Sequence, residues 1–343
     1  MHAMLRKLSE NQFLTRSEAA EAMTLMLNDA CSTEQISGFL LGLRSRKESL
    51  DELVGLTQAM REQCVPVTLP DPKSIDIVGT GGDGLSTFNI STTAALVCAG
   101  AGVSVAKHGN RSVSSKCGSA DVLEALGVAT ELDADQIETC LREAGIAFMF
   151  APVFHTALRH VMPVRRALGV RTCFNILGPL CNPAGVTRHF IGAFSESMAE
   201  TMANILKDLG STHIVAVHSE DGMDEISISA PTTLFRMASD RSGIEKVTIT
   251  PEQFGFERAD LGEIIGGDAV DNAAIVTDVL HDKPGPARDI VVLNAATALY
   301  AAGDAESIQS GVEKAKLSIS DGGAAAALKR LVDVTQDIRR ASR

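Results

Sequence analysis

Tryptophan is absent from this 343-residue chain, and tyrosine occurs once. Cysteine occurs seven times but never as a C-x-x-C pair, so the sequence predicts neither a disulfide framework nor a zinc cluster. We expect reduced thiols in a cytoplasmic protein. The longest apolar run, residues 93–106, is broken by glycines and is too short to cross a bilayer. Residues 1–10 carry charge without a long apolar run, so we expect no secretory signal and no membrane association.

Basic residues are outnumbered, with 31 Lys and Arg against 43 Asp and Glu, which gives a formal net charge of −12. An acidic surface repels phosphate backbones, so general nucleic-acid binding is not expected. Aromatic residues make up only 4% of the chain, but 45% of it is hydrophobic. The core is therefore expected to consist mainly of aliphatic side chains, in about two domains.

The first 65 residues carry only helix signals. Three capping boxes, Thr15-x-x-Glu18, Ser32-x-x-Gln35 and Ser49-x-x-Glu52, each precede apolar residues at helical spacing. Prolines at 66, 70 and 72 then interrupt the pattern. The sequence thus predicts a small helical N-terminal domain over residues 1–70 and a second domain over residues 71–343.

Strand signals begin after residue 74 and alternate with helical stretches. Alternation of this kind predicts an α/β domain with a central, largely parallel sheet flanked by helices. The end of the chain is again helical, over residues 289–302 and about 322–340. The expected strands cover residues 75–78, 103–106, 190–194, 213–217, 226–228 and 233–237.

Residues 84–120 contain no Asp or Glu, although a stretch of this length would contain four or five by proportion. The same stretch contains Lys107, His108, Arg111 and Lys116, together with seven Ser and three Thr. A buried apolar helix explains the first half of it but leaves the polar second half unexplained. In an acidic protein, this composition indicates a local anion-binding site.

Two loops flank this stretch and suit phosphate groups. Residues 79–84 read Gly-Thr-Gly-Gly-Asp-Gly after a strand, and glycines allow backbone N–H groups to approach an anion. A helix that begins near Asn89 and Ser91 adds its N-terminal N–H groups. Residues 107–119 form the second loop, which leads into a helix capped by Ser119 or Asp121. Two loops suit a ligand with two separate phosphate groups.

Gly79, Gly81 and Gly84 also satisfy G-x-G-x-x-G, but no acidic residue follows about 20 positions later, as a dinucleotide site requires. A Walker A loop is absent too. Asp224 and Glu225 follow a predicted strand, and adjacent carboxylates with substrate phosphates suit Mg²⁺. By themselves they are more typical of a solvated acidic turn, but together with a diphosphate site upstream they favour a metal site.

Four arginines, at 159, 165, 166 and 171, lie near the middle of the chain. The planar guanidinium suits a carboxylate, but spacing does not choose among them. His155 and His160 in the same region are more typical of packed or exposed helix positions than of catalysis.

Taken together, these motifs resemble the anthranilate phosphoribosyltransferase family over essentially the whole chain. The residues that carry the resemblance are 79–83, Asn89-x-Ser91-Thr92, 107–111, 119–121, 175–183, Asp221-Gly222-x-Asp224-Glu225, Gly266-Gly267 and Asn272-Ala273.

The resemblance implies transfer of a phosphoribosyl group from phosphoribosyl diphosphate to the amine of anthranilate, the second step of tryptophan biosynthesis. It also implies a middle segment near residues 165–185 that packs on the helical domain, and a homodimer formed through that domain. The implied magnesium ligands are Ser91, Asp224 and Glu225, the implied catalytic residues are Lys107, Asn110 and Arg165, and Asn110 and Arg165 would contact anthranilate. The full set of implied substrate-binding residues is Gly79, Gly82, Asp83, Thr87, Asn89, Ile90, Ser91, Thr92, Lys107, His108, Asn110, Arg111, Ser115, Ser119 and Arg165.

Two alternatives stay open at this stage. A pyrimidine nucleoside phosphorylase has a similar architecture and similar loops, but does not need the Asp224–Glu225 pair. A catalytically silent homologue that binds a phosphorylated regulator is the other, and the intact Lys107 and Asn110 argue against it. No Ser-His-Asp or Cys-His arrangement stands out, so no general base is assigned. His108 is a candidate for lining the anthranilate path.

Overall fold

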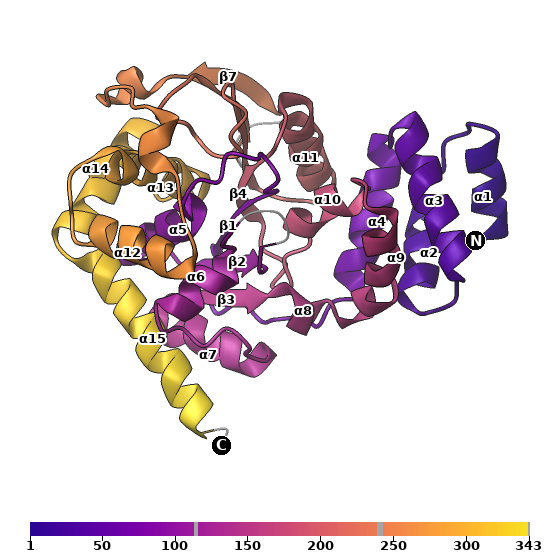
Figure 1. Ribbon diagram of the computed structural model, residues 1–343, viewed down its shortest axis with the longest axis horizontal. Coiled ribbons are helices and arrows are strands. Elements are labelled where there is room, and N and C mark those ends of the chain that lie inside the picture. Colours follow the sequence, from indigo (N-terminus) through magenta and orange to yellow (C-terminus); the bar gives the residue numbers. More distant parts are fainter. Residues whose placement is uncertain (113–115, 239–242, 342–343) are drawn as a thin grey trace.

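The computed structural model describes residues 1–112, 116–238 and 243–341. The first four helices form a bundle that stands apart from the sheet (Figure 1). The three predicted capping boxes are confirmed: Thr15, Ser32 and Ser49 each accept a bond from the backbone of the residue three positions on. The bundle consists of α1 (His2–Ser9), α2 (Arg16–Leu27), α3 (Thr33–Arg46) and α4 (Leu50–Glu62).

Helices α2 and α4 approach closely where α4 carries Gly55. A Cβ at this position would overlap the Arg16 carbonyl oxygen, so glycine permits the contact. Four short helices of the middle of the chain, η1, α9, α10 and η2, extend the bundle core through Val161, Phe174 and Leu177. Their bounds are Thr156–His160, Met162–Leu168, Phe174–Leu177 and Gly178–Leu180.

A seven-stranded sheet forms the centre of the larger part of the molecule, in the order β3-β2-β1-β4-β5-β6-β7. Neighbouring strands from β3 to β5 in this order pair in parallel, whereas β6 pairs antiparallel with both β5 and β7. The predicted helical domain with a largely parallel α/β sheet is therefore confirmed. The strands are β1 (Ile75–Gly79), β2 (Val105–Gly109), β3 (Ile146–Phe150), β4 (Arg188–Gly192), β5 (His213–Ser219), β6 (Thr232–Met237) and β7 (Glu245–Ile249).

The strand predicted at residues 226–228 is wrong. Ile226 and Ser227 are buried but lie outside any strand, because side chains bind their backbone N–H groups. The Asn294 side chain accepts from Ile226 N at 2.9 Å, and the Ser219 hydroxyl accepts from Ser227 N at 3.1 Å. Strands β3 and β7 were not predicted.

Helices cover both faces of the sheet. One core contains Ile75, Ile77 and Phe190 of the sheet together with the apolar sides of α5 and α12–α15. Figure 1 shows these helices on the side of the sheet away from the bundle, with α15 running out to the C-terminus. The other face packs on α7 and α11. The bounds are α5 (Ile90–Gly100), α6 (Ser119–Ala125), α7 (Ala134–Ala144), α8 (Ala151–Phe154), α11 (Glu196–Asp208), η3 (Pro251–Phe254), η4 (Leu261–Ile264), α12 (Ala269–Leu280), α13 (Pro286–Ala301), α14 (Ile308–Ser320) and α15 (Gly323–Ala341).

Within the described ranges, no helix has the length and apolar character needed to span a membrane.

Candidate active site at the carboxyl ends of the strands

The carboxyl ends of β1, β4 and β5 bring together segments that are far apart in the sequence. Gly79 at the end of β1 pairs with Gly192 at the end of β4. A Cβ on Gly79 would lie 2.5 Å from Asp224 Oδ2, and one on Gly192 would overlap the Asp224 carbonyl oxygen. Both positions therefore need glycine so that the turn after β5 can fit against the strand ends. In parallel α/β sheets, ligands bind at this edge.

The glycine loop after β1 is held in an unusual backbone conformation. Gly81 and Gly82 have φ angles of +62° and +76°, which L-residues with side chains rarely adopt. Gly81 N donates to Asp224 Oδ2 at 2.6 Å. The Thr80 backbone N–H donates to the Gly192 carbonyl at 3.0 Å. The loop that the sequence assigns to phosphate thus directly contacts the acidic turn.

Helix α5 begins at this loop with Asn89 as its N-cap residue. The Asn89 side chain does not cap the helix, since its Oδ1 accepts from Asn272 Nδ2 at 2.9 Å. Asn272 Oδ1 in turn accepts from Gly267 N at 2.7 Å. With the cap side chain engaged elsewhere, the first-turn N–H groups of Ser91 and Thr92 are available for an anion.

Three other predicted residues lie near this helix start. Thr92 is buried, and its hydroxyl has no hydrogen-bond partner in the described part of the chain. Thr87 forms a bridge with Ile265 that closes the loop. Asp83 lies close enough to the Asp224 carboxyl to raise its pKa.

Lys107 on β2 reaches the same site from within the sheet. Its side chain is buried, and the ammonium group donates to the Ile77 carbonyl and, at 3.5 Å, to Ser91 Oγ. Burial lowers its pKa, while the nearby carboxylates of Asp76 and Glu225 oppose this shift. A buried cation at this position is suited to a phosphate oxygen.

Asp224 and Glu225 are each only 8% exposed. Burial raises the pKa of both carboxyls, and repulsion from Asp83 raises that of Asp224 further. The Ser91 hydroxyl lowers the pKa of Glu225 by hydrogen bonding. Carboxylates that repel one another in this way fit a divalent cation, which would relieve the repulsion.

Within the described ranges, no group of three or more His, Cys, Asp or Glu side chains could hold a metal ion. Mg²⁺ needs no such group, because it is usually held by one or two carboxylates plus substrate phosphates, and Asp224 and Glu225 supply two carboxylates. The residues present therefore fit the ion that the sequence suggests.

The loop after β2 is arranged around Asp121 at the start of α6. The carboxylate of Asp121 accepts from Gly118 N at 2.8 Å and from Ser112 N at 3.2 Å, while Gly118 is the N-cap residue. Ser119 is the first residue of α6. Ser119 or Asp121 was expected as the cap, and both are wrong as the N-cap residue: Asp121 acts from the third position of the helix, by accepting from Gly118 N. Ser115 lies outside the described residues.

Asn110 and Arg111 behave differently from each other. Asn110 is exposed, and its Oδ1 accepts from Arg111 N at 2.7 Å. The Arg111 guanidinium forms ion pairs with Asp121 at 3.0 Å and with Glu124 at 2.7 Å. The structure gives Arg111 a role in holding the loop to α6, and its predicted contact to substrate stays a prediction.

Arg165 lies on α9 in the middle segment, with its guanidinium carbon 5.0 Å from the centre of the Phe174 ring. Burial lowers its pKa.

His108 lies on β2. The centre of its ring lies 5.1 Å from that of His155, and burial lowers the pKa of His108 to about 3. Because His108 is therefore neutral near pH 7, it is suited to lining an apolar substrate path and not to holding a positive charge.

Three residues that sequence reasoning gave no role contribute to this region. The Asp76 carboxylate is buried beside Lys107 and accepts from His108 N at 3.1 Å. Asn272 fixes the start of α5 through its bond to Asn89. The Arg171 guanidinium donates to the Gly82 carbonyl. Asn272 belongs to the Asn272-Ala273 motif that carries the family resemblance, but the residues around it in the sequence do not indicate Asn89 as its hydrogen-bond partner.

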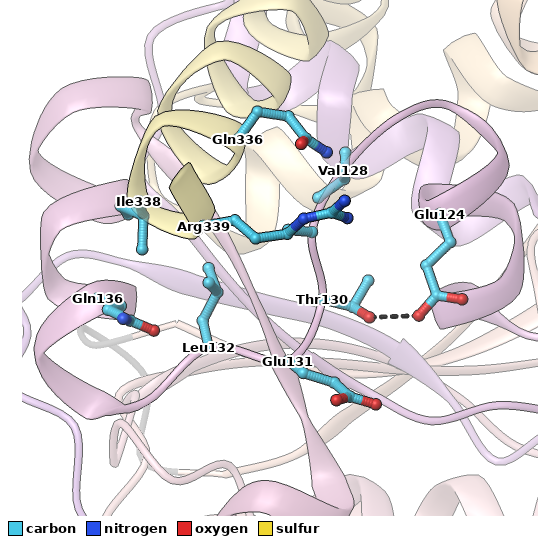
Figure 2. Close-up of a pocket in the computed structure, with 10 residues that line it drawn as sticks. Glu124, Val128, Thr130, Glu131, Leu132, Gln136, Gln336, Ile338 and Arg339 are labelled. Atoms are coloured by element: carbon cyan, nitrogen blue, oxygen red, sulfur yellow. Dashed lines mark hydrogen bonds between the residues drawn. The ribbon is translucent and has the colours of Figure 1, made fainter. Parts of the chain in front are cut away.

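A separate cavity of about 490 Å³ lies between the ends of α6, α7 and α15. Figure 2 shows its polar wall, where the Thr130 hydroxyl donates to Glu124 at 2.5 Å. Among the residues that the structure describes, no predicted site residue lines this cavity. One of its lining residues, Glu124, forms an ion pair with Arg111 of the loop after β2.

Comparison with known proteins agrees with this arrangement. Residues 71–325 match the α/β domain of a glycosyl transferase family, and residues 2–64 match its helical bundle domain. Anthranilate phosphoribosyltransferase of Salinibacter ruber is 52% identical over 99% of each chain. The chain belongs to the anthranilate phosphoribosyltransferase family. The corresponding protein of Moorella thermoacetica is 48% identical over 97% of each chain.

Solved structures of this family have the same fold. An anthranilate phosphoribosyltransferase from Thermus thermophilus superposes with a TM-score of 0.92 at 40% identity, over 97% of this chain and 99% of that one. The Saccharomyces cerevisiae protein, solved in complex with PRPP and Mg, gives 0.90 at 28% identity, over 98% and 97%. The family resemblance read from the motifs is confirmed.

Proposed function

We propose that this chain transfers the phosphoribosyl group of 5-phosphoribosyl 1-diphosphate to the amine of anthranilate. The products are N-(5-phosphoribosyl)anthranilate and diphosphate, in the second step of tryptophan biosynthesis from chorismate. The observation that carries the proposal is the contact between the glycine loop and the acidic turn. The buried Lys107 of β2 reaches Ser91 beside this contact. In a member of this family, that contact places anion donors and carboxylates at one strand edge.

The donor binds to the residues that follow β1 and β2. Backbone N–H groups of the glycine loop and of the first turn of α5 receive phosphate oxygens. Lys107 supplies the positive charge. The described residues of this donor site are Gly79, Gly82, Asp83, Thr87, Asn89, Ile90, Ser91, Thr92, Lys107, Arg111 and Ser119, and Ser115 completes the proposed set.

Asp224, Glu225 and Ser91 are the residues that would hold magnesium beside the diphosphate of the donor. When bound, the ion neutralises charge that develops on the departing diphosphate. It also accounts for two buried, mutually repelling carboxylates next to a phosphate site, which would otherwise oppose an anionic ligand.

Departure of diphosphate leaves an oxocarbenium-like ribose carbon, so the main catalytic task is to stabilise the leaving group. Lys107 and the loop N–H groups do this from fixed positions that need no rearrangement during the reaction. Anthranilate carries an aromatic amine that is neutral near pH 7 and needs little activation. Holding this amine against the ribose carbon therefore matters more than a strong base.

Anthranilate is positioned by Arg165 and Asn110, with His108 lining its path. The Arg165 guanidinium offers a planar pair of donors to the carboxylate of anthranilate. The partly apolar surroundings that lower the pKa of Arg165 also strengthen such a pairing.

The division of the chain follows from the same proposal. Residues 1–70 form the helical domain, residues 71–343 form the catalytic domain, and the segment near 165–185 packs on the former. A homodimer forms through the helical domain, which exposes Phe13 (59%) and Leu41 (41%) to solvent.

A fluorescence assay of anthranilate consumption tests the proposed function. Consumption is expected only when both phosphoribosyl diphosphate and Mg²⁺ are present. Phosphorolysis of thymidine or uridine without anthranilate turnover would instead establish a nucleoside phosphorylase. Tight donor binding without any turnover would establish a silent homologue.

A further inference from the structure

The guanidinium of Arg171 bridges the middle segment and the glycine loop. Its Nη2 donates to the Gly82 carbonyl at 2.7 Å, across 89 residues of sequence. Its guanidinium carbon lies 4.5 Å from the centre of the Phe194 ring. A charged donor on a neutral acceptor gives a stronger bond than a neutral pair, and the aromatic face holds the guanidinium in place.

Phe194 is itself tied to the same loop. It follows β4, and its backbone N–H donates to the Thr80 hydroxyl at 3.1 Å. The contacts therefore form a closed circuit: Arg171 to Gly82, along the loop to Thr80, on to Phe194, and back to Arg171. A circuit with two anchors on one loop restrains its conformation more than a single contact does.

The glycine loop needs such a restraint. Gly81, Gly82 and Gly84 all have positive φ angles, and glycine loses more conformational freedom on ordering than any other residue. The second side-chain anchor of the loop is the Asp224 carboxylate, which accepts from Gly81 N. Asp224 is also the proposed magnesium ligand. The bond from Arg171 to Gly82 uses no carboxylate and so does not compete with the metal.

The backbone around Arg171 forms a short link that is held between α9 and α10. Gly169 ends α9 with a φ of +61°, and Thr172 N donates to the Asn175 side chain at 3.0 Å where α10 begins. The same short link follows the helix that carries Arg165. The anchor of the donor loop and the proposed anthranilate contact thus belong to one segment.

We propose that Arg171 is a positioning residue for the donor site: it holds the Gly82 carbonyl and so aligns the loop N–H groups with the phosphates of the donor. This inference rests on the proposed function. The proposal does not extend to Arg166, which is exposed on α9. Among the described residues, the structure records no hydrogen bond or ion pair to Arg166.

The test compares Arg171→Ala with the matched control Arg166→Ala in the full-length protein. Calorimetry measures the dissociation constant of phosphoribosyl diphosphate with Mg²⁺, and steady-state kinetics measure KM for both substrates. For Arg171→Ala we expect donor affinity to fall by about tenfold, the usual effect of losing one charge-assisted hydrogen bond. The KM for anthranilate and the melting temperature should match the control.

Donor affinity equal to that of Arg166→Ala would overturn the proposal, and so would an equal loss for both substrates. If Arg171→Ala does not fold, Arg171→Met takes its place, because it keeps a long unbranched side chain but has no N–H donor for the Gly82 carbonyl. Wild-type donor affinity in Arg171→Met then counts against the role. Phe194→Leu should weaken donor binding in the same direction. Because donor binding is measured without turnover, a wild-type chain that binds the donor but leaves anthranilate unchanged refutes the proposed function alone.

Discussion

Gly79 and Asp224 lie so close that the added Cβ of an alanine at position 79 would be 2.5 Å from the Asp224 carboxylate. The first residue ends β1 and the second belongs to the turn after β5. No side chain fits between them, so the acidic turn rests directly on the end of the first strand. This contact brings the proposed metal ligands to the proposed phosphate loop.

Replacing Gly79 with Ala should therefore displace the carboxylate of Asp224. Overpacking of this kind typically costs about 1–3 kcal/mol, and we expect turnover to fall by about 10- to 100-fold. Gly243→Ala is the control, since an added Cβ there meets no atom of the described residues within 4 Å. Steady-state kinetics of both variants check the prediction. Equal activity in the two would show that the acidic turn can move without consequence.

The double variant Asp224→Asn with Glu225→Gln should lose nearly all turnover and require much higher Mg²⁺ for what remains. The physical reason is that neutral amides attract the cation far less than carboxylates do. Activity measured against magnesium concentration tests this. Glu220→Gln, on the exposed side of the same turn, should behave as the unmodified protein does. An unchanged magnesium curve in the double variant would remove both residues from the ligand set.

Arg165→Ala should raise the KM for anthranilate while sparing affinity for phosphoribosyl diphosphate. Loss of hydrogen bonds to a charged group typically costs about 1.5–3 kcal/mol, which corresponds to roughly 10- to 150-fold in KM. Arg166→Ala on the same helix provides the comparison. If both substrates are affected equally, the specific role of Arg165 in binding anthranilate is wrong.

His189 is buried in neutral form and should make a contribution to stability that is lost in acid. Burial lowers the pKa of His189 from 6.5 to about 3. The unfolded chain therefore binds a proton near pH 6.5 that the folded chain does not. The stabilising contribution is complete above pH 6.5 and is lost as pH falls toward 3, by up to about 1.4 kcal/mol per pH unit.

His189→Gln should flatten this dependence, whereas His281→Gln, on the exposed end of α12, should not. Urea unfolding at pH 7, 6 and 5 measures the slope. If lowering the pH reduces the free energy of unfolding of His189→Gln as steeply as that of the unmodified chain, the buried ring is not a source of the acid sensitivity.

Local sequence signals predicted the helical domain well. Ser32 and Ser49 cap their helices as expected because a capping box is complete within four residues and needs no tertiary partner. The strand expected at residues 226–228 failed for the opposite reason. Its apolar alternation is real, but Asn294 and Ser219, distant in sequence, bind its backbone N–H groups in place of a neighbouring strand.

The sequence by itself determined the helix starts, the glycine loop, the acid-free stretch and the family, because each is carried by residue types at short spacing. Only the tertiary structure decided that Asp224 meets Gly81, that Asn272 fixes Asn89, and that Arg171 among the four arginines reaches Gly82. The reason is physical: parallel strands align their carboxyl ends, and so bring into contact residues separated by 89 to 183 positions that no local pattern relates.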